Sequence, residues 1–122
     1  MPTNDWIPMP HFVVDCSQSI LQAQNEEQLV DRVHRAANST GLFEESDIKV
    51  RVNPYTTYSV GNRQEAFIHV FASIMEGRSI EARAGLSKVV VSELTSMFPK
   101  VRSIAINVSE FEQATYCHRE ML

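Results

Sequence analysis

The chain has 122 residues, a net charge of -4, 43% hydrophobic and 21% charged residues, which together describe one ordinary globular domain. The acidic balance gives no general attraction to nucleic acid or to an anionic membrane surface, so we expect neither as a partner. No apolar run approaches the roughly 20 residues of a membrane span and no signal-peptide pattern opens the chain, so we expect a cytoplasmic protein.

The N-terminal region contains two Met-Pro pairs, Met1-Pro2 and Met9-Pro10, and only the second runs directly into a strand-like stretch that ends near Cys16. We predict an irregular lead over residues 1–9 and one domain over residues 10–122. Proline is a secondary-amine base only when its nitrogen is a free chain terminus. A chain that begins at Pro10 after loss of Met9 would have that base, whereas a chain that begins at Met1 keeps Pro10 in a peptide bond.

The rest of the chain predicts two strand–helix–strand units. A first helix begins near Asn25, which can cap it with Gln28, and Gly41 follows its end. Strands are expected over 48–55, 65–75 and 101–108, with a turn over 60–63. A second helix, capped by Ser79 and ended by Pro99, should bury Ile80, Val90, Leu94 and Met97 or Phe98. This order predicts an α+β fold, β-α-β repeated twice, with a four-stranded sheet and both helices on one face.

The strand over 65–75 is apolar on both faces, which indicates that both faces are covered. With only two long helices, a partner subunit is expected on the side away from them. Within this strand His69 is expected to be a hydrogen-bonded core or interface residue. Cys16 and Cys117 have no metal-ligand spacing and are expected to be buried or half-buried free thiols.

Several segments together resemble one family. They are 9–17 (MPHFVVDCS), 40–43 (TGLF), 66–70 (AFIHV) and 77–83 (GRSIEAR), and they are similar in order and spacing to the 5-carboxymethyl-2-hydroxymuconate isomerases of the tautomerase superfamily. The resemblance covers nearly all of the chain from Met9 onward. It implies a βαβ repeat assembled as a homotrimer, with an N-terminal proline at a pocket between subunits, and a dienol-to-keto isomerisation in aromatic-acid catabolism without metal or cofactor.

The resemblance also implies site residues. The catalytic proline falls on Pro10 and the arginine of the G-R-S segment on Arg78. Where the family has I-R-S-R, this chain has 48–51 (IKVR), so Lys49 replaces an arginine expected to hold the substrate and Arg51 matches. Lysine lacks the planar fork that grips a carboxylate, which predicts weaker or altered preference for diacids.

His11 would alter the pKa of the Pro10 amine or line the entrance of the pocket. A neutral Pro10 nitrogen would act as general base and acid, while Lys49, Arg51 and Arg78 bind carboxylates and stabilise the dienolate. The functional prediction is an isomerase of an unsaturated 2-hydroxy diacid. The alternative is a non-catalytic trimer of the same fold that binds a small organic acid or a protein partner, if Pro10 is not the mature N-terminus. A weaker third possibility is promiscuous tautomerase activity on phenylpyruvate-like enols.

Overall fold

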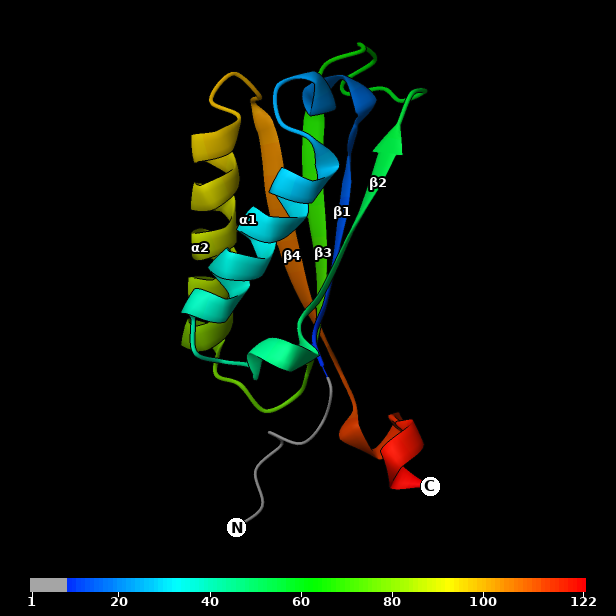
Figure 1. Cartoon of the computed structure of the whole chain (residues 1–122), viewed down its shortest axis with the longest axis vertical. Coiled ribbons are helices and arrows are strands. Elements are labelled where there is room, and N and C mark those ends of the chain that lie inside the picture. The colour runs from blue at the N-terminus through cyan, green and yellow to red at the C-terminus, as the bar shows by residue number, and fades with distance from the viewer. Residues whose placement is uncertain (1–8) are drawn as a thin grey trace.

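A computed structural model describes residues 9–122, so the predicted lead, apart from Met9, lies outside the described residues. Four strands and two long helices make up the domain (Figure 1). In chain order they are β1 (His11–Ser17), α1 (Glu26–Ser39), β2 (Lys49–Tyr55), β3 (Phe67–Met75), α2 (Ile80–Met97) and β4 (Ser103–Phe111). Short 3-10 turns, Gln18–Gln22, Glu45–Asp47, Gln113–Thr115 and Arg119–Met121, complete the chain.

The sheet has the order β2-β1-β3-β4. β1 and β2 pair in parallel, as do β3 and β4, while the central strands β1 and β3 run antiparallel with His11 opposite Ser73. Each parallel pair is joined through one long helix, so the predicted double β-α-β architecture is confirmed. Figure 1 shows both helices on the same face of the sheet.

Local sequence signals fix both helix starts. The Asn25 side chain accepts from the Gln28 amide at 2.8 Å and the Gln28 side chain accepts from the Asn25 amide at 2.9 Å. Ser79 accepts from the Ala82 amide at 3.0 Å. Gly41 has φ 72° directly after the α1 C-cap, a backbone conformation that glycine adopts without steric cost. These caps confirm the predicted boundaries.

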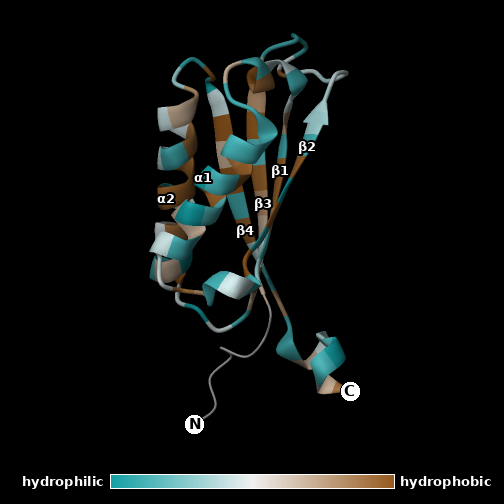
Figure 2. Ribbon diagram, in the orientation of Figure 1, coloured by the Kyte–Doolittle hydropathy of each residue, from teal (hydrophilic) through white to brown (hydrophobic). Residues whose placement is uncertain are grey.

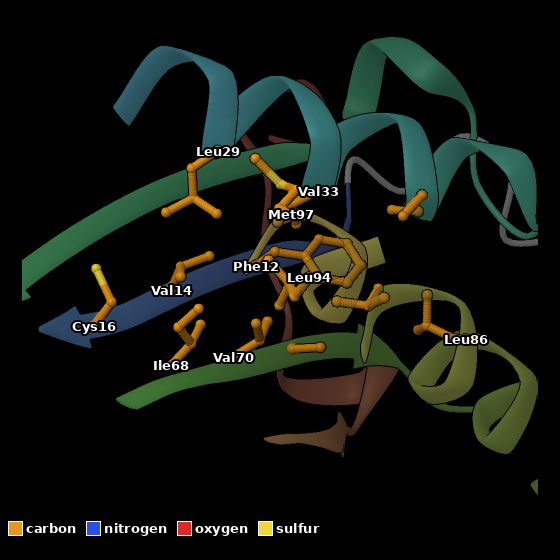
Figure 3. Packing of buried hydrophobic residues seen from close by; sticks show 14 of the residues in the cluster. Phe12, Val14, Cys16, Leu29, Val33, Ile68, Val70, Leu86, Leu94 and Met97 are labelled. Atoms are coloured by element: carbon orange, nitrogen blue, oxygen red, sulfur yellow. The ribbon is translucent and has the colours of Figure 1, made fainter. Parts of the chain in front are cut away.

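The core lies between the sheet and the two helices. Figure 3 shows alternate strand residues meeting residues of both helices, and Figure 2 shows hydrophobic residues along most of the central strands. Its fully buried members include Phe12, Val14, Ile68, Val70, Leu29, Val33, Leu86 and Leu94. No helix within residues 9–122 is long and apolar enough to cross a membrane.

Two burial predictions are wrong. Ile80 is 72% exposed because it is the first residue of α2, six residues before Leu86, where the buried stripe of that helix begins. Cys117 is exposed rather than buried, since it follows the end of β4 in the C-terminal tail, whereas Cys16 is fully buried in β1. The predicted last strand also ends too early, because β4 continues to Phe111.

No helix of the described chain covers the sheet face opposite α1 and α2 (Figure 1). Phe71 is 43% exposed and Tyr55 is 42% exposed on this open face. His69 is half-buried there, bonded to the Asn107 amide oxygen at 2.6 Å and stacked 4.4 Å from the Phe71 ring. The predicted hydrogen bond of His69 is thus confirmed, and its predicted interface with a partner stays a prediction.

Candidate functional site

The head of β1 meets three other strand ends. Because β2 is parallel to β1 and β3 is antiparallel to it, the start of β2 and the ends of β3 and β4 lie at this same end of the sheet (Figure 1). The Lys49 amide donates to the Pro10 carbonyl at 3.2 Å, which ties the start of β2 to the residue preceding β1. Residues more than 100 positions apart in sequence, Met9 and Phe111, therefore meet at this end of the sheet.

Pro10 is fully buried. Its nitrogen is in a peptide bond with Met9, so in this chain the proline has no titratable amine. Met9 is itself only 6% exposed and forms a small cluster with Met75, Phe111 and Tyr116. Met9 therefore packs against the ends of β3 and β4 and against the C-terminal tail.

Three polar residues predicted for the site lie beside one another on β1 and β2. The Lys49 ammonium donates to the Asp47 carbonyl at 2.7 Å, and Arg51 Nη1 donates to His11 Nδ1 at 3.0 Å. Burial lowers the pKa of His11, and the charges of Arg51 and Lys49 lower it further. His11 is therefore neutral near pH 7 and accepts from Arg51, which holds a second cation near Lys49.

Arg78 has different surroundings. Its guanidinium donates to the Leu42 carbonyl and lies 5.3 Å from the centre of the Phe43 ring. Phe43 in turn packs edge-on against Phe12 on the helix side of the sheet, with ring centres 6.1 Å apart. The structure thus brings Arg78 to the same end of the sheet as Pro10, in contact with Leu42 and Phe43. Its predicted action together with Lys49 and Arg51 stays a prediction.

The sequence analysis missed the aromatic wall beside Met9. Phe111 and Tyr116 stack with ring centres 6.0 Å apart and an interplanar angle of 26°. The Glu76 amide donates to the Phe111 carbonyl at 3.1 Å, and the Glu76 carboxylate accepts from the Gln113 amide at 2.8 Å. These bonds fix the C-terminal tail against the end of β3. Only the tertiary fold brings these rings to Met9, and the local sequence carries no signal of it.

The sheet order, the two helices on one face and the polar cluster at the head of β1 define a protein of the tautomerase fold. A 5-carboxymethyl-2-hydroxymuconate isomerase from Deinococcus radiodurans R1 has a similar structure, with a TM-score of 0.77, 20% identity, and 90% of this chain and 88% of that chain covered. A fused 4-OT, described as a wild-type asymmetric trimer, gives a TM-score of 0.74 at 9% identity, with 89% and 92% covered. Likeness at these identities shows the fold alone.

Sequence comparison identifies the family. The chain belongs to the 5-carboxymethyl-2-hydroxymuconate isomerase family, a family of isomerases, whose family model matches residues 10–119. It is also 27% identical over 106 residues to the 5-carboxymethyl-2-hydroxymuconate Delta-isomerase of Escherichia coli, which covers 85% of this chain and 84% of that protein. The family match begins at Pro10, which is the residue at the head of β1.

Proposed function

We propose that this chain, when it begins at Pro10, converts 5-carboxymethyl-2-hydroxymuconate or a similar unsaturated 2-hydroxy diacid from the dienol to the keto form. The observation that carries this proposal is the family match that starts at Pro10, a fully buried residue with cationic side chains nearby. The reaction would serve the breakdown of aromatic acids. We further propose a cytoplasmic location, because Cys16 and Cys117 are free thiols, as is usual in a reducing compartment.

A free Pro10 amine would supply the base. An α-amine in water has a pKa of about 8, and both burial and nearby cations favour its neutral form. The neutral nitrogen takes the proton of the substrate 2-hydroxyl, the electron pair moves through the conjugated carbons, and the same proton returns to carbon. The balance requires no oxidant, reductant or metal.

Lys49 and Arg51 would hold the carboxylates of the substrate. His11 would keep Arg51 in place, because the two side chains share a hydrogen bond. The predicted role of Arg78, stabilisation of the dienolate, requires its guanidinium to give up the Leu42 carbonyl or to bind both groups together. The uncovered sheet face supports assembly as a homotrimer, with Phe71 and Tyr55 covered by neighbouring subunits.

The second candidate is a non-catalytic protein of the same fold that binds a small organic acid. A specific observation favours it, because in this chain Met9 is bonded to the Pro10 nitrogen and packs against Met75, Phe111 and Tyr116. The two candidates differ only in the state of the Pro10 nitrogen.

The experiment that tests the proposal is N-terminal sequencing and intact mass of the protein purified from its native host, with an ultraviolet assay of muconate ketonisation on the same sample. We expect a chain that begins at Pro10, is active, and loses activity in Pro10→Ala. Pro99→Ala is the matched control, because Pro99 is exposed after the end of α2. A chain that retains Met9 and is inert would instead establish the binding protein.

A further inference from the structure

A pocket opens at the end of the sheet opposite Pro10. It lies between the turn that follows β1, the C-terminal end of α2 and the segment that leads into β4 (Figure 1), and its volume is about 440 Å³. A smaller hollow of about 200 Å³ shares Ala66, Lys100 and Val101 with this pocket, so the two adjoin. Pockets of roughly 300–1,000 Å³ are the size class that binds small organic molecules.

The floor of the pocket is apolar and held by local turns. Ile20, Met97 and Phe98 form it, with 5%, 7% and 4% of their surfaces exposed, and all three belong to the core between the sheet and the helices. The Ile20 carbonyl accepts from the Ala23 amide at 3.2 Å, and the Phe98 carbonyl accepts from the Val101 amide at 3.1 Å. Because these backbone bonds already hold both turns, a ligand can bind without ordering either of them.

Two cations stand at the rim. Lys100 lines both hollows and Arg102 lines the smaller one, and both side chains are exposed. Within residues 9–122 neither cation forms a hydrogen bond or an ion pair, whereas three arginines of the two helices are paired with carboxylates. The half-buried Glu65 also lines the smaller hollow, so two cations face one carboxylate there. The charge at this rim is therefore positive in a chain whose net charge is -4.

We infer that this pocket binds a small aromatic carboxylate, with the ring on the apolar floor and the carboxylate at Lys100 and Arg102. The Phe98 ring and the Met97 thioether are side chains that contact aromatic rings favourably. A carboxylate can pair with the two cations without displacing an existing partner. The pocket opens on the helix side of the sheet, so assembly through the opposite sheet face leaves it accessible. This site goes beyond the proposed function, because Pro10 lies at the other end of the sheet.

A pair of matched probes tests the inference in the full chain. The probes 2-naphthoate and 2-naphthamide have the same ring system, and only the first is charged. We expect 2-naphthoate to bind about fivefold more tightly, which is the size of effect that exposed ion pairs produce. In amide NMR spectra recorded during the titration, the signals of Ile20, Ala66 and Val101 should shift. Equal affinity for the two probes, or shifts confined to other parts of the chain, would overturn the inference.

One double variant tests the charge. Lys100→Gln combined with Arg102→Gln should weaken the binding of 2-naphthoate about fivefold and leave that of 2-naphthamide unchanged. Its matched control, Lys88→Gln combined with Arg119→Gln, removes two exposed cations elsewhere and should change neither affinity. A loss of 2-naphthoate affinity as large in the control as in the first variant would refute the site, because only the net charge of the chain would then matter.

A second variant tests the cavity. Ala23 is exposed at the rim, so Ala23→Phe should place a ring in the pocket and abolish the binding of both probes there. Ala84→Phe is the matched control, since Ala84 is exposed on α2, and it should bind both probes like the parent chain. The melting temperature of each variant shows that it is folded. Full binding in Ala23→Phe would overturn the inference. These measurements involve no catalytic step, so an inert chain would refute the isomerase and leave this binding site standing.

Discussion

Replacement of Arg78 by alanine separates a structural role of this residue from a catalytic one. Its guanidinium joins the segment after α1 to the segment after β3, through the Leu42 carbonyl and the Phe43 ring. A hydrogen bond from a charged donor contributes about 1.5–3 kcal/mol and an exposed cation–π contact about 0.5–1 kcal/mol. Because Arg78 is half-buried, solvent screening reduces both contributions. We expect Arg78→Ala to lower the free energy of unfolding by about 2 kcal/mol.

Urea denaturation at one fixed protein concentration measures this loss as a lower midpoint with an unchanged slope. Arg102→Ala is the control, because Arg102 is exposed, and it should stay within about 0.5 kcal/mol of the parent. Phe43→Leu should reproduce part of the loss by removing the ring alone. A fall in kcat/KM of Arg78→Ala with no change in stability would refute the reasoning, because the arginine would then act on substrate without holding the loop.

Three further predictions concern packing, thiol reactivity and pH. Leu94→Ala should lower the free energy of unfolding in urea by about 3 kcal/mol, because Leu94 is fully buried. Ile80 is 72% exposed on the same helix, so Ile80→Ala should cost less than about 0.5 kcal/mol. Equal losses would refute the assignment of the buried stripe. A disulfide reagent should modify one thiol, Cys117, rapidly, and Cys16 only after unfolding, because Cys16 is buried and its pKa is raised to about 11; two fast thiols would contradict this. Because the pKa of His11 is lowered in the folded state, the unfolded chain takes up a proton more readily. The stability that His11 contributes is therefore present above its unfolded pKa near 6.5 and is lost as the pH falls through that value toward the lowered pKa. His11→Asn should flatten the decline in unfolding free energy between pH 7 and pH 5, and an unchanged decline in denaturation curves would count against it.

The architecture could be predicted from local signals because those signals are strong. Helix starts are fixed by side chains that accept hydrogen bonds from backbone amides, those of Asn25 with Gln28 and of Ser79. The end of α1 is followed by Gly41 with its positive φ. Each of these signals acts over four residues or fewer. The turn at 60–63 is equally local, with Gly61 at φ 57° followed by Asn62 at φ 64°. These elements needed no tertiary information.

The site could be predicted only in part. Pro10, Lys49, Arg51 and His11 are adjacent along paired strands, so the strand pattern and the family resemblance placed them correctly at one end of β1 and β2. The partners of Arg78 are a carbonyl 36 residues earlier and a ring 35 residues earlier in the chain, and neither can be predicted from the G-R-S segment. Phe111 and Tyr116 reach Met9 because β4 pairs with β3 and continues to Phe111, three residues beyond the predicted end of that strand.

Because β1 and β3 run antiparallel, the two halves of the chain contribute different residues to the candidate site. The first half carries Pro10, Lys49 and Arg51, and the second half carries Arg78 and the Phe111 and Tyr116 rings that pack against Met9, so the candidate site draws on both β-α-β units. The corresponding place in the second half, the head of β3, lies at the other end of the sheet, where the Ser17 hydroxyl instead accepts from the Phe67 amide at 2.8 Å. Two units of similar architecture thus place the candidate site at one end of the sheet and the bond between Ser17 and Phe67 at the other, and the candidate site takes residues from both units.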